Sequence, residues 1–370
     1  MEQYTKAKLK SMKSQIKSIG LASPGQPIRQ ELICSFMQKA HDLDAQESRK
    51  LAYVYRKSGI AQRYSALEDF RFSSAEDFRF FPKNNSLEPF PTTGCRMEVF
   101  RQVAPQLAKE AIEKCLEKSQ LEPNQITHLI LISCTGMYAP GVEMDIIDSM
   151  GFASNVERYA IHFMGCYAAF NGIKMADRIC NSEPSAKVLV LSVELCTLHF
   201  QKEYNEDNIL ANALFGDGAA AVLIAQGEKG LQIEDYESNI IPDGADDMAW
   251  AIGNFGFQMK LSKYIPGLLE KGIKQFSEGM EKRFGLSGIK YFAIHPGGKQ
   301  ILNKVEAAFG IEERQNKYAH QVLKNFGNMS SVTILFVLEA ILRDAKIHGK
   351  VLAMGFGPGL TLESLLISKS

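Results

Sequence analysis

Short apolar runs alternate with amphipathic segments from about residue 125 onward. Three runs are continuous and rich in β-branched or small apolar residues: ITHLILISC (126–134), KVLVLSVEL (187–195) and AAAVLIA (219–225). Runs of this length and composition are typical of buried strands. After Cys166, apolar residues recur at approximately helical spacing: Ala168, Phe170, Ile173, Ala176 and Ile179. This part of the chain therefore predicts an α/β fold in which strands alternate with a helix.

A second set of elements has the same pattern. KYFAIHP (290–296) and VLAMGFGPG (351–359) predict strands that end in turns, and apolar positions within 332–341 predict a helix between them. The spacing repeats too, because His128 lies 38 residues before Cys166 and Tyr291 lies 37 residues before Asn328. Cys166 and Asn328 both follow a glycine and both begin a predicted helix.

This repetition predicts two similar α/β halves packed together. We place them at residues 20–227 and 228–370, and we expect one compact body because no proline- or serine-rich linker separates them. The segment 235–285 is less regular, and we expect it to contain a loop over the site. The basic residues 1–20 predict a solvated arm or frayed helix.

Composition narrows the class of protein. Lys+Arg and Asp+Glu both number 42, so the zero net charge gives no indication of a nucleic-acid partner. No apolar run approaches the roughly 18 residues that span a bilayer, so we expect no membrane span. The seven cysteines are scattered, without disulfide pattern or metal-ligand spacing. We therefore expect no metal and a reducing compartment, the cytoplasm.

Cys166 is the first candidate for chemistry. A helix N-terminus carries free N–H groups and partial positive charge, which favour the thiolate and predict a lowered cysteine pKa. From local sequence alone, a buried structural cysteine fits as well. His295 lies at the end of a predicted buried strand and would face the same seam between the halves. A cysteine paired with a histidine can form a thiolate–imidazolium pair.

Asn328 occupies the position in the second half that Cys166 occupies in the first. An asparagine before a helix usually caps it. Opposite a cysteine and a histidine, however, an uncharged donor suits the stabilisation of a thioester oxyanion or an enolate.

Five segments give the chain a family resemblance: FMGCYAAFNGI (163–173), ALFGDGAAAVLI (213–224), AIHPGG (293–298), FGNMSS (326–331) and GFGPGLTLE (355–363). With these segments in this order, residues 25–370 resemble the type III polyketide synthases, the chalcone synthase-like branch of the thiolase superfamily, and its bacterial members in particular. The resemblance implies a thiolase-like fold with two duplicated βαβαβ halves in an α/β/α/β/α arrangement.

The resemblance also implies an activity. A homodimeric acyltransferase would use acyl-CoA and malonyl-CoA directly, without a cofactor or an acyl carrier protein. Cys166 would hold the acyl starter, and His295 and Asn328 would stabilise the enolate that forms when malonyl-CoA loses CO₂. Repeated decarboxylative Claisen condensation and cyclisation would give a pyrone, a resorcinol or a related phenol.

Further residues acquire expected roles from the same resemblance. Phe215 matches the family's gatekeeper phenylalanine, and Lys50 and Lys57 match lysines that bind coenzyme A phosphates. The family's arginine between those lysines is Tyr53 here, so Arg56 is expected to support phosphate binding. Five substrate-cavity positions depart from the plant pattern and are expected to reshape the cavity, with bulk at 199 and 250: Cys134, Ala139, His199, Trp250 and Met259.

Three alternatives share the fold. A β-ketoacyl-ACP synthase III uses the same three residues, but it would carry a basic docking patch and a GNTS-type motif where this chain has GNMSS. A hydroxymethylglutaryl-CoA synthase would carry a glutamate motif upstream of the cysteine. A non-enzymatic scaffold would have lost one of the three residues, and all three are present.

Overall fold

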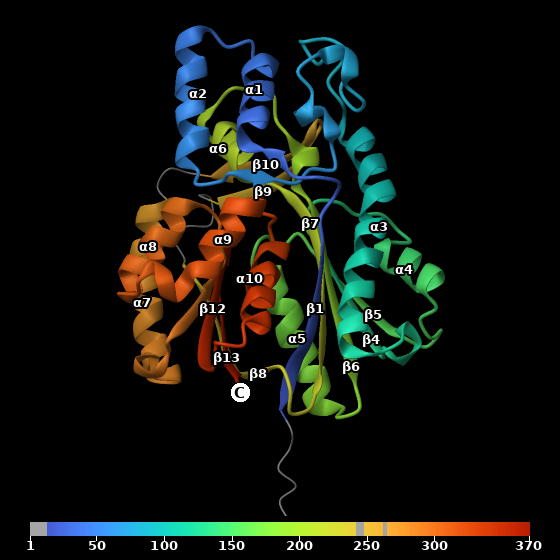
Figure 1. Ribbon diagram of the computed structural model, residues 1–370, viewed down its shortest axis with the longest axis vertical. Helices are drawn as coiled ribbons and strands as arrows, with labels where there is room; N and C mark the ends of the chain where they lie inside the picture. Colours follow the sequence, from blue (N-terminus) through green and yellow to red (C-terminus); the bar gives the residue numbers. More distant parts are fainter. Residues whose placement is uncertain (1–12, 242–247, 262–264) are drawn as a thin grey trace, which may run out of the picture.

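A bent sheet forms the centre of the molecule (Figure 1). The computed structural model describes residues 13–241, 248–261 and 265–370. Within these residues the sheet has nine strands in the order β11-β12-β13-β8-β1-β7-β6-β4-β5. Their bounds are β1 Ser14–Ala22, β4 His128–Ser133, β5 Glu157–His162, β6 Lys187–Leu195, β7 Asp217–Gln226, β8 Leu231–Ile240, β11 Tyr291–Ile294, β12 Gly349–Gly357 and β13 Thr361–Lys369.

The sheet contains one arrangement twice, which confirms the predicted duplication. In the first half, β4 runs parallel to β6, β6 antiparallel to β7 and β7 antiparallel to β1. In the second half, β11, β12, β13 and β8 repeat these directions in this order. The halves join through β1 and β8, which pair at Gln15–Gln232 and Ile16–Leu231.

Helices complete the five layers (Figure 1). The helices α5 (Ala168–Ser182) and α10 (Val332–Arg343) lie between the two halves of the sheet. On the outer faces lie α3 (Thr93–Ser119) and α4 (Val142–Met150) on one side, and α7 (Ile265–Phe284) and α8 (Lys299–Phe309) on the other. The layered α/β/α/β/α arrangement is therefore the one expected.

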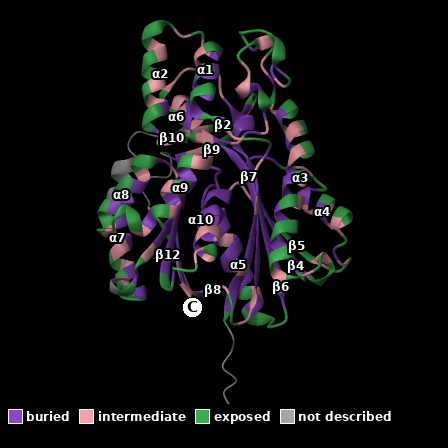
Figure 2. Ribbon diagram, in the orientation of Figure 1, coloured by how far each residue is buried: buried purple, intermediate pink, exposed green. Residues whose placement is uncertain are grey.

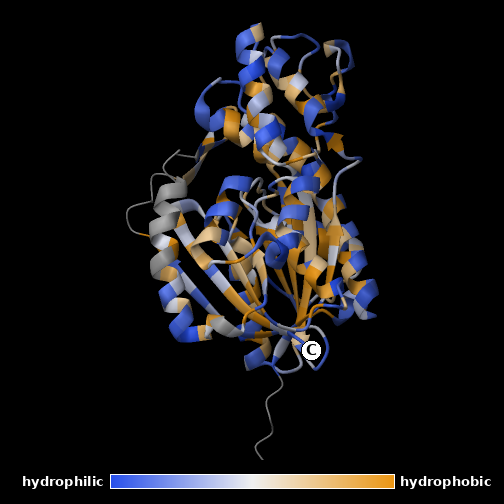
Figure 3. Cartoon of the chain, turned by 60° about the vertical axis from the view of Figure 1, so that its left-hand side comes forward, coloured by the Kyte–Doolittle hydropathy of each residue, from blue (hydrophilic) through white to orange (hydrophobic). Residues whose placement is uncertain are grey.

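Burial on both faces explains why the strands read as unbroken apolar runs. In β4, Leu129 and Leu131 belong to the core beneath α3, whereas Ile130 and Ile132 belong to the core around α5 and α10. Figure 2 shows these strands buried, and Figure 3 shows their hydrophobic character. A strand that is covered on both sides has no position for a solvated polar residue.

The chain before residue 20 corrects one expectation. Residues 14–20, which we expected in a solvated arm, lie in β1 at the centre of the sheet, so the first half begins before residue 20. Ser14 and Ser18 are buried there and bond to Asp177 and Cys115. The rest of the expected arm, residues 1–12, lies outside the described residues.

A smaller layer of elements covers one end of the sheet. It contains α1 (Gln30–Ala40), α2 (Ala45–Lys57), α6 (Glu206–Leu214) and the short pair β2 (Ile28–Arg29) and β3 (Gln62–Arg63). The hairpin of β9 (Met248–Gly253) and β10 (Gly256–Leu261) lies beneath them, and α9 (Lys317–Phe326) lies nearby (Figure 1). The irregular segment 235–285 is therefore mostly strand and helix, while residues 242–247 and 262–264 are not described.

Candidate active site

A tight turn positions Cys166. The strand β5 ends at His162, and α5 begins at Ala168, so the chain reverses within a few residues. Gly165 has φ +83°, and a Cβ at this position would meet Cδ of Pro358 at 2.2 Å. Only glycine avoids both the backbone strain and this contact. The turn therefore holds Cys166 against the loop of the second half that comes after β12.

His295 is buried directly after β11. Its backbone N–H donates to the carbonyl oxygen of Met354 at 2.7 Å, and the residue is 1% exposed. Neither ring nitrogen has a hydrogen-bond partner among the described residues. Burial lowers the pKa of His295 to about 3, so the ring is neutral at physiological pH. Because buried polar atoms are almost always bonded, two free nitrogens in one ring suggest a place for a substrate.

Asn328 is held by backbone contacts with the first half. Its N–H donates to the carbonyl oxygen of Leu214 at 2.9 Å, and its carbonyl oxygen accepts from the N–H of Gly216 at 2.9 Å. Its side-chain Oδ1 accepts from the N–H of Ser330 at 2.9 Å, and its Nδ2 donates weakly to Gly297 at 3.3 Å. The helix α10 begins only at Val332, so Asn328 is not its cap.

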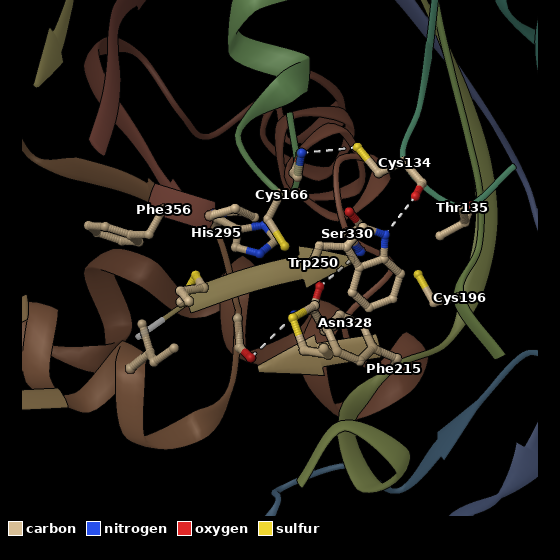
Figure 4. Close-up of a pocket in the computed structure, with 16 residues that line it drawn as sticks. Cys134, Thr135, Cys166, Cys196, Phe215, Trp250, His295, Asn328, Ser330 and Phe356 are labelled. Atoms are coloured by element: carbon tan, nitrogen blue, oxygen red, sulfur yellow. Dashed lines mark hydrogen bonds between the residues drawn. The ribbon is translucent and has the colours of Figure 1, made fainter. Parts of the chain in front are cut away.

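Cys166, His295 and Asn328 line one cavity, as the duplicated pattern predicted. The imidazole lies beside the cysteine sulfur, and the asparagine lies across the cavity (Figure 4). The cavity contains about 650 Å³ of empty space, including its opening to solvent. Its other lining residues include four that the sequence suggested: Cys134, Phe215, Trp250 and Met259.

The electrostatics of Cys166 differ from the expectation. Burial raises the pKa of the Cys166 thiol to about 12, although the hydroxyl of Ser330 and the amide of Asn328 act in the opposite direction. The expected lowering at the helix start is therefore outweighed by loss of solvent. With these pKa shifts the site holds a neutral thiol and a neutral imidazole rather than a thiolate–imidazolium pair.

Trp250 forms one wall of the cavity. Its indole N–H donates to the carbonyl oxygen of Cys134 at 2.9 Å, and the Cys134 sulfur accepts from the N–H of Gly165 at 3.0 Å (Figure 4). Met259 is its cross-strand partner in the β9–β10 hairpin. The β9–β10 hairpin thus forms the side of the cavity that contacts Cys134, which itself bonds to Gly165 next to the nucleophile.

A second cavity, with about 480 Å³ of empty space including its opening, lies behind this wall. It shares Cys196, Phe215, Trp250 and Met259 with the first cavity, and His199 lines it. His199 accepts at Nδ1 from the N–H of Phe257 at 3.0 Å, so its Nε2 carries the proton that it donates to Thr135 at 2.7 Å. Burial lowers its pKa to about 3. His199 therefore lines the second cavity and not, as expected, the one at Cys166.

The remaining sequence candidates lie at the surface. Ala139 is exposed and lines neither cavity of this chain. Lys50, Arg56 and Lys57 are exposed on α2, where Lys50 pairs with Glu47 at 2.6 Å. Their expected contact with coenzyme A stays a prediction.

The sequence did not single out other residues of the cavity. Ser330 and Pro358 lie inside segments that carried the family resemblance, so a closer look at FGNMSS and GFGPG could have found them. Cys196 and Thr135 line the cavity without any spacing signal. They are brought there by the ends of β6 and β4, which are adjacent in the sheet.

Comparisons with known proteins cover nearly all of the chain. The family model for chalcone and stilbene synthases, N-terminal domain, matches residues 1–228, and that for the C-terminal domain matches residues 232–370. In the solved structure of PKS-I from the brown alga Ectocarpus siliculosus, the match has a TM-score of 0.91 and 26% identity and covers 97% of this chain and 99% of that one.

Two curated relatives illustrate the range of lengths. "Probable polyketide synthase 1" of Dictyostelium discoideum is 26% identical over 94% of this chain, which spans only 11% of that much longer protein. "Alpha-pyrone synthesis polyketide synthase-like Pks18" of Mycobacterium tuberculosis is 29% identical over 88% of this chain and 83% of its own length.

No helix among the described residues is both long and apolar enough to cross a membrane. The duplicated thiolase-like fold and the two family models agree on one class of condensing enzyme. The chain belongs to the chalcone and stilbene synthase family and is a type III polyketide synthase.

Proposed function

We propose that Cys166 carries the acyl starter and that His295 and Asn328 activate malonyl-CoA for condensation. One observation carries this proposal. The buried His295 ring lines the same cavity as Cys166, and neither of its nitrogens has a hydrogen-bond partner among the described residues. The proposed reaction uses no cofactor.

Loading begins from the neutral pair. The Cys166 sulfur attacks the acyl-CoA carbonyl, its proton passes to His295, and the carbon–sulfur bond to coenzyme A breaks. The departing coenzyme A thiolate takes the proton back from the imidazole. Because burial raises the pKa of the Cys166 thiol, ionisation of the thiol accompanies this attack and does not precede it.

Condensation uses the other two residues. Loss of CO₂ from malonyl-CoA leaves an electron pair that moves onto the thioester oxygen as an enolate. An Nδ2 hydrogen of Asn328 and a ring N–H of His295 stabilise that oxygen. The enolate carbon then attacks the Cys166 thioester, a carbon–carbon bond forms, and the cysteine leaves as a thiolate. The extended chain on coenzyme A returns to Cys166 for another round.

Coenzyme A would enter beside Phe215 and lie against α2. Lys50, Arg56 and Lys57 supply cations on its exposed face. Lys299 adds a further cation near the end of α2. Its side chain lies next to Gly59, so close that a Cβ on this glycine would be 3.1 Å away from it. This lysine offsets the tyrosine at position 53, and phosphates favour such clusters.

The product is proposed to be a pyrone, a resorcinol or a related phenol, with the pyrone favoured. The relative Pks18 is named for α-pyrone synthesis. Trp250 also limits the space behind Cys166, since it belongs to the wall that the two cavities share. A short polyketide that cyclises to a pyrone through one of its own oxygen atoms needs little space.

A homodimer is proposed from the edge of the sheet. The strand β5 is an edge strand whose residues 157–160 are exposed, and Tyr159 and Met164 beside it are 36% and 37% exposed. An unpaired edge with apolar side chains is a natural site for pairing with a second copy. Light scattering of the wild type and of Ala160→Pro would test it, and a monomeric wild type would contradict it.

A cytoplasmic location is proposed from the thiols. All seven cysteines are unpaired, and two of them, Cys134 and Cys166, line the same cavity. A reducing compartment keeps such thiols available.

Mass spectrometry of products from malonyl-CoA and a panel of acyl-CoA starters tests the catalytic proposal. The Cys166→Ala variant should form no polyketide and should still decarboxylate malonyl-CoA slowly. Polyketide from that variant at the wild-type level would overturn the proposal.

A further inference from the structure

Arg63 is a buried cation that bonds mainly to backbone carbonyl groups. It lies in β3 and is 2% exposed. Its guanidinium donates to the carbonyl oxygen of Phe215, to that of Asn212 at 2.5 Å and to Oε1 of Gln30 at 3.0 Å. No carboxylate in the described parts of the chain forms an ion pair or hydrogen bond with it. The buried carboxylate of Asp217 attracts Arg63 from beyond ion-pair distance. Burying a charge without a directly bonded counter-ion is costly, so the position of Arg63 calls for an explanation.

The acceptors on the backbone all lie at the end of one helix. The last carbonyl groups of a helix have no intrahelical partner and carry partial negative charge. At the C-terminus of α6, Arg63 takes the carbonyls of Asn212 and Phe215, and Nε2 of Gln30 donates to the carbonyl of Ala213 at 2.8 Å. The carbonyl of residue 214 is taken by Asn328. Every carbonyl from 212 to 215 is therefore engaged.

This helix end joins the mouth of the cavity to the proposed enolate-binding residue. Phe215 and Asn328 form a parallel β-bridge, which two backbone hydrogen bonds of 2.9 Å complete. Both residues line the cavity at Cys166. Arg63 does not line that cavity; it lines the second one, together with Phe215, and so supports the bridge from outside the site.

We propose that Arg63, oriented by Gln30, is a positioning residue that fixes Asn328 and Phe215 relative to Cys166. The inference rests on the proposed role of Asn328 in binding the enolate. A planar guanidinium can hold three acceptors in fixed directions, whereas an ammonium on a flexible stem cannot. The charge is retained because it sets the geometry of the bridge.

Arg63→Lys and Arg63→Met test the proposal. Misplacing a catalytic group by about 1 Å can cost up to about 100-fold in rate. We expect kcat for malonyl-CoA decarboxylation to fall between about 10- and 100-fold in Arg63→Met and less in Arg63→Lys. Rates are normalised to folded enzyme, well below the melting temperature of each variant, and KM for malonyl-CoA is measured alongside.

Arg96→Lys is the matched control. Arg96 is also fully buried and also donates to carbonyl groups, those of Pro91, Leu198 and Phe200, without a carboxylate partner among the described residues. None of its acceptors bonds to Asn328. We expect this variant to lose stability as Arg63→Lys does and to keep its decarboxylation kcat within about twofold.

Asn328→Ala separates two kinds of failure. If this variant decarboxylates malonyl-CoA at the wild-type rate, the proposed function of Asn328 fails. If it loses that activity while both Arg63 variants keep full kcat per folded molecule, the positioning role of Arg63 is wrong. A fall in kcat for the Arg63 variants and not for Arg96→Lys supports it.

Discussion

The two glycine turns that end at Cys166 and Asn328 hold equivalent places in the two halves of the fold. Gly165 has φ +83° and Gly327 has φ +70°, so both need the left-handed conformation. Each turn packs against the other half. A Cβ at Gly165 would meet Pro358 at 2.2 Å, and one at Gly327 would meet the carbonyl oxygen of Leu214 at 2.7 Å. The cavity thus lies where the two duplicated turns cross.

The turns differ in how the next helix begins. The helix α5 begins two residues after Cys166, whereas α10 begins four residues after Asn328. The extra residues let Asn328 form a β-bridge with Phe215 of the first half. Duplication therefore places Cys166 and Asn328 on one cavity. The local structure that holds them differs, because Cys166 lies at a helix start and Asn328 lies in a β-bridge. One position suits a nucleophile and the other suits a fixed amide.

Replacing Gly165, in the turn before Cys166, by alanine should lower polyketide formation more than any change in the turn before Asn328. The new Cβ meets the ring of Pro358, and the left-handed φ adds about 1–3 kcal/mol of strain. Because the sulfur of Cys166 must then move, polyketide formation should fall below detection. Decarboxylation of malonyl-CoA should persist. Product analysis and a decarboxylation assay check this, and normal polyketide yield would contradict the tight fit of the turn.

Gly327→Ala, in the turn before Asn328, should slow the decarboxylation of malonyl-CoA. Its Cβ would meet the carbonyl oxygen that accepts the N–H of Asn328. Loss of one oxyanion donor costs about 10²–10³-fold in rate, so the decarboxylation kcat should fall by up to that factor. Gly151→Ala is the control, because Gly151 has φ +75° with open space around its Cβ position. If Gly151→Ala lowers that kcat equally, backbone strain alone explains the loss.

The pH dependence of alkylation should show whether burial or the helix N-terminus determines the pKa of the Cys166 thiol. With a thiol pKa of about 12, the thiolate fraction rises about tenfold for each pH unit between about pH 7 and 10. The rate of iodoacetamide reaction at Cys166, measured as the difference between the wild type and Cys166→Ala, should rise in the same proportion. A plateau near about pH 8 would show that the helix start dominates.

The main strands and the cluster of three residues could be predicted from the sequence, because burial on both faces leaves a visible apolar run. The predicted strand 187–195 is β6 itself. By contrast, β1 was hidden in a basic segment, since its polar residues Ser14 and Ser18 are satisfied by distant partners. The pKa of Cys166 and the location of His199 also depend on elements far away in the sequence, and no local pattern contains that information.

Trp250→Gly should have the smallest effect on rate and should change specificity. The indole lines both cavities, as Cys196, Phe215 and Met259 also do, and is fixed to the half with Cys166 by its bond to the carbonyl of Cys134. Removing it should join the cavities and raise kcat/KM for longer acyl-CoA starters by about 10-fold, the gain expected from a few more buried methylenes. Trp250→Phe keeps most of the bulk and loses only the hydrogen bond, so its selectivity should stay close to that of the wild type. Kinetics across a series of acyl-CoA chain lengths measure both. Equal selectivity in the wild type and Trp250→Gly would mean that the wall between the cavities is made by Phe215 and Met259 without the indole.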